Sequence, residues 1–202
     1  MAKLYFRYGT VGSAKTMNLL AVAHNYRAQN KIVLLVKPKL DTRFGLDTIK
    51  SRSGLEMEAD VVLEHEQLLD PDKLKGLHCV LVDEAQFFAT EVVDQFRSIA
   101  SDIGIPVICY GLRGDFRNEL FEGSKRLLEL ADSIEEVKTT CSFCNKKAIF
   151  NLKLRGGVPT IGGPKIELGA EETYQPTCSF CYSRQLEMVA EGEFSKSQPL
   201  RH

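Results

Sequence analysis

The sequence predicts an α/β fold: a mostly parallel sheet with helices on both faces, followed by a small C-terminal zinc-binding lobe. Three observations support this prediction. Apolar strands alternate with amphipathic helices, a glycine-rich loop joins the first strand to the first helix, and four cysteines form two Cys-x-x-Cys pairs late in the chain. The chain has 202 residues, a length that suits one compact domain with a small appendage. Its formal net charge of −1 argues against a protein whose main role is to bind a polyanion.

The strands and helices of the sheet domain are expected in strict alternation. We expect strands at 4–8, 32–37, 79–83, 106–110 and 133–140, and helices at 16–29, 91–103 and 121–131. The strands at 32–37 and 79–83 are continuous apolar runs, which are typical of strands buried on both faces. The helix at 91–103 carries apolar residues at helical spacing and ends at Gly104. Such alternation is typical of a parallel sheet.

The character of the chain changes near Thr140. Glycines become frequent after this point and helical periodicity disappears. We therefore expect a nucleotide-binding domain at 1–140, a zinc-binding domain at 141–190 and a disordered tail at 191–202. The apolar runs are too short to cross a bilayer, and Arg7 follows the only apolar stretch of the N-terminus, so we expect a cytoplasmic protein without a signal peptide or membrane partner.

A phosphate-binding loop is predicted between the first strand and the first helix. Residues 9–16 match the P-loop pattern G-x-x-x-x-G-K-[ST] except that alanine replaces the second glycine. Backbone amides and the positive end of the helix would bind phosphate oxygens, Lys15 would reach the β- and γ-phosphates, and the Thr16 hydroxyl would bind Mg²⁺. The candidate phosphate ligands are Gly9, Thr10, Val11, Gly12, Ser13, Ala14, Lys15 and Thr16.

Two other interpretations of this loop stay open. It could be a strand-to-helix turn without a ligand, or a dinucleotide fingerprint. The fingerprint expects an acidic residue after the next strand, where this chain has Lys37-Pro38-Lys39. The methyl group of Ala14 would crowd the backbone or strain a residue with positive φ.

Adjacent carboxylates end the strand at 79–83. A buried strand that finishes in aspartate is the Walker B arrangement, so Asp83 would hold Mg²⁺ beside the loop that carries Lys15. Glu84 would orient or deprotonate an attacking hydroxyl. The alternative is that both residues only cap the following helix. Because the two motifs occur in the order that a P-loop enzyme requires, we expect a nucleoside triphosphate to bind.

Four cysteines form a candidate zinc site. Cys141, Cys144, Cys178 and Cys181 are two Cys-x-x-Cys pairs, and four thiolates satisfy a structural Zn²⁺ completely. The alternative is two redox or buried pairs. The glycine-rich segment between the pairs is a candidate lid over a ligand, or an exposed β-hairpin.

The assembled pattern resembles the type II, zinc-containing thymidine kinases. The P-loop, Asp83-Glu84-x-Gln86-Phe87, Gly111-Leu112-Arg113-x-Asp115-Phe116 and the late cysteines occur together in that family, and the likeness runs from about residue 4 to 182. The resemblance implies transfer of the γ-phosphoryl group of ATP, with Mg²⁺, to the 5′-hydroxyl of thymidine or deoxyuridine. It also implies a homotetramer inhibited by dTTP, with structural zinc and no nucleic-acid partner.

By position, the same resemblance assigns roles to individual residues. Glu84 would be the catalytic base, and Arg43 would lie near the phosphates. A loop called the lasso, here 151–174, would close the nucleoside pocket. The residues expected to bind the nucleoside are Val11, Phe87, Leu112, Phe116, Phe121, Asn151, Ile166, Leu168, Gly169 and Tyr174. The chain departs from the family pattern at Ala14, at Ala170 and in its all-cysteine second zinc pair.

Two rival functions remain at this point. The tetrapeptide Asp-Glu-Ala-Gln also resembles a helicase motif, which indicates a nucleic-acid-stimulated ATPase with a zinc-ribbon lobe, although such motors need a second nucleotide-binding lobe. The third hypothesis is a non-enzymatic zinc-ribbon module whose P-loop has decayed at Ala14.

Overall fold

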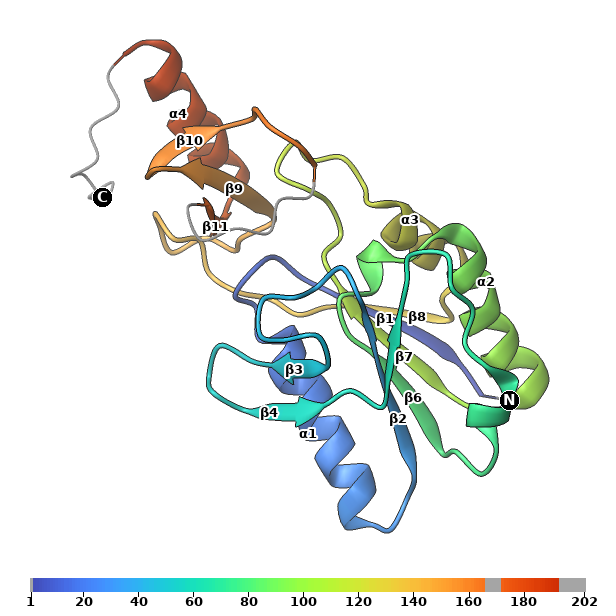
Figure 1. The fold of residues 1–202 in the computed structure, drawn as a ribbon. Helices are drawn as coiled ribbons and strands as arrows, with labels where there is room; N and C mark the ends of the chain where they lie inside the picture. Colours follow the sequence, from blue (N-terminus) through green and yellow to red (C-terminus); the bar gives the residue numbers. More distant parts are fainter. Residues whose placement is uncertain (1, 166–171, 193–202) are drawn as a thin grey trace.

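The main sheet of the molecule has six parallel strands (Figure 1). The computed structural model describes residues 2–165 and 172–192. The strand order is β5-β2-β6-β7-β1-β8. The bounds are β1 Leu4–Tyr8, β2 Val33–Pro38, β5 Val61–Leu63, β6 Cys79–Val82, β7 Val107–Gly111 and β8 Ser133–Glu136. Because every residue of β2, β6 and β7 is buried, these strands need the continuous apolar runs that the sequence shows.

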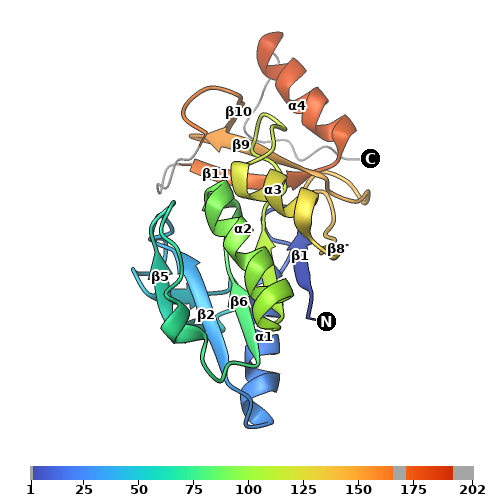
Figure 2. The same cartoon turned by 90° about the vertical axis from the view of Figure 1, so that its right-hand side faces the viewer.

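Helices cover both faces of this sheet, as predicted. On one face α1 (Lys15–Ala28) packs with the small antiparallel hairpin of β3 (Thr48–Lys50) and β4 (Glu56–Glu58). On the other face lie α2 (Thr90–Ser98) and α3 (Glu122–Leu130), which Figure 2 shows in front of the sheet. Alternate residues of each strand contribute to the two cores, so Phe6 faces α2 and α3 while Leu81 faces α1.

Some predicted boundaries differ from those observed. The expected helix at 91–103 is α-helical only to Ser98 and continues as a π-helical turn, Ile99–Ile103, before Gly104 adopts a left-handed φ of 82°. The expected strand at 133–140 ends at Glu136, because its partner β1 ends at Tyr8 and the last pairing bond joins the Val137 amide to the Tyr8 carbonyl. The three-residue strands β3, β4 and β5 are too short for a periodicity signal.

A smaller lobe follows β8. It contains the antiparallel sheet β10-β9-β11, with β9 Phe150–Arg155, β10 Val158–Thr160 and β11 Glu172–Thr177, and the helix α4 (Ser179–Ala190). Leu152, Leu154 and Tyr182 form its apolar core. The expectation that helical structure is absent after Cys141 was wrong, since α4 packs against β9 through Tyr182 and Leu186. Residues 150–160 form a β-hairpin, which was one of the two interpretations of the segment between the cysteine pairs. Gly156 and Gly157 turn the chain there with positive φ.

The small lobe sits at the edge of the main sheet where β1 and β7 end (Figure 1). Tyr182 Oη on α4 donates a hydrogen bond of 2.5 Å to the Phe116 carbonyl in the segment after β7. A domain boundary at residue 140 stays a proposal. Of the expected tail, only residues 191 and 192 are among those described. Within the described ranges, none of the helices combines the length and apolar composition needed to cross a bilayer.

Candidate active site at the carboxyl ends of the strands

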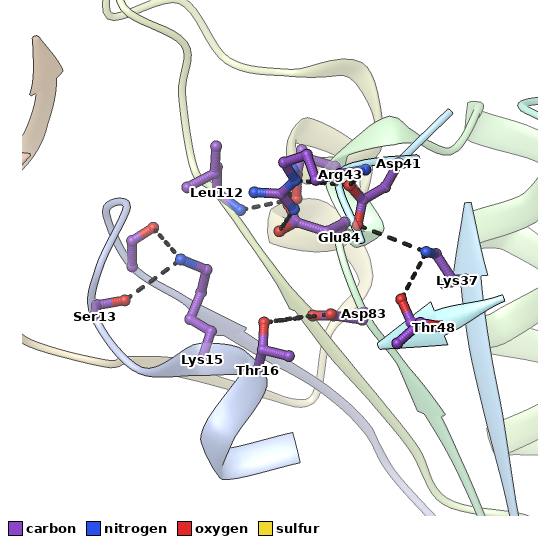
Figure 3. A network of polar contacts seen from close by, with 12 residues as sticks. Ser13, Lys15, Thr16, Lys37, Asp41, Arg43, Thr48, Asp83, Glu84 and Leu112 are labelled. Carbon is purple, nitrogen blue, oxygen red and sulfur yellow. Dashed lines mark hydrogen bonds and ion pairs between the residues drawn. The ribbon is translucent and has the colours of Figure 1, made fainter. Parts of the chain in front are cut away.

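The phosphate loop folds around the ammonium group of Lys15. Lys15 Nζ donates to the Thr10 carbonyl at 2.7 Å, and lies 3.3 Å from the Gly9 carbonyl and 3.4 Å from Ser13 Oγ. Figure 3 shows this side chain pointing back into the loop. At Gly9, a Cβ would lie 2.4 Å from Ser13 Oγ and 2.5 Å from the Val137 carbonyl, so the loop cannot form with a side chain there.

Ala14 occupies the backbone conformation that glycine usually supplies. Its φ of 66° and ψ of 22° place it in the left-handed region directly before α1. Gly12 has a φ of 71°. The loop therefore keeps a glycine-like path despite the alanine, and the cost is backbone strain rather than a changed shape.

The two motifs predicted to share a magnesium ion meet in space. The Thr16 hydroxyl lies 3.3 and 3.4 Å from the two carboxylate oxygens of Asp83 (Figure 3). The phosphate loop follows β1 and the acidic pair follows β6. Strand β7 lies between these two strands, so the two motifs are two strand spacings apart. Parallel strands end at one edge of a sheet, and that geometry brings the helix start and the acidic strand end together.

Glu84 is held in a network of charges. One carboxylate oxygen pairs with Arg43 Nη2, and the other accepts a hydrogen bond from Gln86 Nε2 at 2.5 Å. Arg43 Nε also donates to Asp41 Oδ1 at 2.7 Å, and the buried Lys37 ammonium lies 4.0 Å from Asp41 Oδ2 (Figure 3). Glu84 has a left-handed φ of 47°, a strained conformation that this network over-determines.

Burial and neighbouring charges perturb these groups. Burial lowers the pKa of Lys15 to about 8, against the attraction of Glu84 and Asp83. Burial and the charge of Glu84 raise the pKa of Asp83. Burial acts to raise the pKa of Glu84 too, but Arg43 and Lys15 outweigh it and lower that pKa. A buried lysine and two buried carboxylates with shifted pKa values in one place are typical of a functional site.

A cavity of about 480 Å³ lies over the phosphate loop. Its walls are 11–17, 43–44, 50–53 and Glu84. Residues 11–16, Arg43 and Glu84 of this wall are among the predicted site residues, whereas Arg52 in the wall and Lys37, Asp41 and Gln86 beside it are not. Gln86 follows the acidic pair directly, so its position was a usable signal. Lys37, Asp41 and Arg52 come from loops and strand ends whose approach depends on the tertiary fold.

The residues expected to bind a nucleoside come together in pairs. The Val11 amide donates to Asn151 Oδ1 at 2.9 Å. The ring centroids of Phe87 and Phe121 lie 5.7 Å apart in an edge-to-face arrangement, and those of Phe116 and Tyr174 lie 6.4 Å apart with the rings tilted by 46°. The Leu112 amide donates to Gln86 Oε1 at 2.9 Å, which ties this segment to the acidic motif. Ile166, Leu168 and Gly169 lie outside the described residues.

The four late cysteines converge. The Sγ atoms of Cys141, Cys144, Cys178 and Cys181 all lie within 4.8 Å of one another, and those of Cys144 and Cys178 are 3.6 Å apart. A tetrahedral zinc with bonds of about 2.3 Å would hold its sulfurs about 3.8 Å apart. The cluster could therefore hold a zinc ion with no open position.

The family model and the curated relatives agree on one family. The family model described as thymidine kinase matches residues 2–182. A thymidine kinase from Lactococcus lactis subsp. lactis is 46% identical over 88% of this chain and 95% of its own. One from Lactiplantibacillus plantarum is 46% identical over 90% of this chain and 96% of its own. Among solved structures, the Pif1 helicase from Candida albicans aligns with 67% of this chain and 36% of its own at 12% identity, with a TM-score of 0.40, which is too low to support an argument.

Proposed function

This chain belongs to the thymidine kinase family, and we propose that it transfers the γ-phosphoryl group of ATP to the 5′-hydroxyl of thymidine or deoxyuridine. The product dTMP would enter pyrimidine deoxynucleotide salvage. One observation carries the proposal: the phosphate loop, Thr16 and Glu84 line one cavity large enough for a triphosphate, and Asp83 contacts the Thr16 hydroxyl beside it.

The phosphate loop would supply positioning and positive charge. Phosphoryl transfer passes through a loose transition state, so the protein mainly aligns the groups and neutralises charge. In the nucleotide-free protein, Lys15 is held by carbonyl oxygens and a hydroxyl of its own loop. The charged oxygens of a triphosphate are stronger hydrogen-bond acceptors for the Lys15 ammonium than these groups are. The backbone amides of the loop and of the first turn of α1 would bind the remaining phosphate oxygens.

Thr16 and Asp83 fit a magnesium ion. A hydroxyl and a carboxylate are the hard oxygen donors that Mg²⁺ prefers, and here they lie side by side at the mouth of the phosphate loop. Burial and the neighbouring charge of Glu84 raise the pKa of Asp83, and a bound cation would offset both effects. When bound, the ion would neutralise charge on the β- and γ-phosphates.

Glu84 would accept the proton of the nucleoside hydroxyl. Its lowered pKa keeps the carboxylate charged at neutral pH, and the fixed partners Arg43 and Gln86 hold its orientation. A weak base suffices for this reaction, because the attacking oxygen needs to lose its proton only late in a loose transition state. Arg43 would add positive charge at the cavity wall, where it stands between Asp41 and Glu84.

The nucleoside would bind between the main sheet and the small lobe. Phe87, Phe116 and Phe121 offer apolar surface, and Tyr174 on β11 lies against Phe116. Asn151 ties the phosphate loop to this region, since its side chain accepts from the Val11 amide and donates to the Gly114 carbonyl. The Asn151 side chain would thus fix the position of the nucleoside-binding segment relative to the phosphate loop.

The deciding experiment is thymidine-dependent formation of ADP from Mg·ATP by the wild-type protein and by Glu84→Gln. Loss of a general base costs about 10² to 10⁴ in rate, and we expect kcat to fall by that factor. The control is Glu58→Gln, which removes a carboxylate from the exposed strand β4. Wild-type kcat in Glu84→Gln would remove Glu84 as the base, and no thymidine-dependent turnover by the wild-type protein would remove the proposed reaction.

Further properties of the family are proposed on the resemblance alone. We expect a homotetramer in the cytoplasm, feedback inhibition by dTTP and a structural zinc ion at the four cysteines. Light scattering, a dTTP titration and metal analysis test these in turn. The alternative of a nucleic-acid-stimulated ATPase is not favoured, since the relatives at 46% identity are named thymidine kinases. Single-stranded DNA should therefore leave ATP turnover unchanged.

A further inference from the structure

The β3–β4 hairpin brings an arginine over the phosphate loop. Arg52 lies in the turn between the two strands, and its Nη1 atom is 3.9 Å from the point where a side chain at Gly12 would begin. Residues 50–53 line the same cavity as residues 11–17. The guanidinium group therefore faces the backbone that is expected to bind phosphate.

The turn that carries Arg52 is firmly anchored. Ser51 is buried and makes two hydrogen bonds with the exposed Leu55: the Ser51 amide donates to the Leu55 carbonyl at 2.8 Å, and the Leu55 amide donates to Ser51 Oγ at 3.1 Å. Ile49 inserts into the core beneath α1, and the buried Lys37 donates to the Thr48 carbonyl at 2.9 Å. The hairpin thus presents Arg52 from a fixed base, which reduces the entropy lost when it binds an anion.

The charge around Arg52 is unbalanced. Other cations of this wall have acidic partners: Lys50 pairs with Glu56 at 2.6 Å, and Arg43 pairs with Asp41 and Glu84. Within the described ranges, Arg52 makes no ion pair, and its charge adds to the effects that disfavour protonated Lys15, after burial itself and the repulsion from Arg43. An anion bound in the cavity would reduce the repulsion between Arg52 and the other two cations.

We propose that Arg52 is a further phosphate-binding residue, which contacts the terminal phosphates of the triphosphate from the β3–β4 hairpin. The proposal rests on the proposed function for the identity of the nucleotide, but phosphate binding can be measured without turnover. A guanidinium fork suits two phosphate oxygens at once, whereas an ammonium acts as a single point charge. The hairpin would then close one side of the cavity over the bound triphosphate.

The test is equilibrium binding of Mg·ATP and of magnesium tripolyphosphate to the wild-type protein and to Arg52→Ala, Arg52→Lys and Arg27→Ala. We expect Arg52→Ala to weaken both ligands by about 10- to 100-fold, as loss of a charge-assisted hydrogen bond would. Arg52→Lys should retain more affinity than Arg52→Ala. Arg27→Ala is the matched control, because it removes an exposed arginine from α1, where it pairs with Asp60.

The outcomes separate this proposal from the proposed function. Wild-type affinity in Arg52→Ala, or an equal loss in Arg27→Ala, would overturn the role of Arg52 whether or not the protein phosphorylates thymidine. A loss specific to Arg52→Ala would support it even if thymidine proved not to be the substrate. The unfolding temperature should stay the same in all variants, and an affinity loss in an equally stable Arg52→Lys protein would itself support the contact.

Discussion

Replacing Ala14 by glycine should stabilise the protein. A residue with a Cβ in the left-handed region costs about 1–2 kcal/mol, and Ala14 sits there with a φ of 66°. Glycine loses more freedom on folding, which offsets about 0.4–1 kcal/mol of that gain. The methyl group is exposed, so its removal leaves no cavity. We expect Ala14→Gly to raise the free energy of unfolding by about 1 kcal/mol, since the strain relieved exceeds the entropy lost.

Thermal and denaturant unfolding measure this change. For a chain of this size, 1 kcal/mol corresponds to roughly 2–4 °C in Tm. The matched control is Asn30→Gly, because Asn30 is also exposed with a φ of 58°, but asparagine tolerates this region better than alanine does. If Ala14→Gly gains no more stability than Asn30→Gly, then the alanine is not strained and the argument fails.

Four other predictions concern single groups. Burial lowers the pKa of Lys15 to about 8, and bound phosphates would raise it. Affinity for Mg·ATP should therefore be level below pH 8 and fall by up to about tenfold per pH unit above it. A calorimetric affinity that stays constant up to about pH 9.5 would contradict this. Lys37→Met removes a buried ammonium that donates to the Thr48 carbonyl, while Asp41 keeps its pairing with Arg43, so we expect the free energy of unfolding to fall by about 1–3 kcal/mol in urea titrations, and an unchanged midpoint would contradict this. Alanine in place of a helical glycine usually stabilises, but in the first turn of α3 Gly123→Ala would place a Cβ 2.6 Å from the Ala85 carbonyl, so we expect a loss of about 1–3 kcal/mol, and a gain in Tm would refute the packing argument. Cys178→Ser should lower the zinc content and loosen the small lobe, and metal analysis showing full zinc would reject the assignment.

The central elements of the fold could be predicted because their signals are local. The strands β2, β6 and β7 are continuous apolar runs, and their observed bounds lie within one residue of the expected ones. The missed features depend on partners instead. Strand β8 ends where β1 stops offering hydrogen bonds, and the hairpin of β3 and β4 has only three residues in each strand. Its burial under α1 could not be inferred from composition.

The site divides in the same way. Lys15, Thr16 and Asp83 follow fixed motifs in the sequence, and parallel strands must end at one edge, so their meeting was predictable. Arg43 entered only through the family resemblance; it pairs with Glu84, and its place near the phosphates stays a prediction. Arg52 had no signal of its own, because an arginine in a polar turn looks like any solvated surface residue.

The hydrogen bond from Tyr182 to the Phe116 carbonyl joins two parts of the molecule that perform different tasks. Tyr182 directly follows Cys181 on α4, so whatever fixes the cysteine cluster also fixes this phenol. Phe116 would line the acceptor side of the pocket, far along the chain from the phosphate loop. Oxidation of the thiols or loss of the metal should therefore first reduce the selectivity for the nucleoside, while the affinity for the phosphate donor is retained.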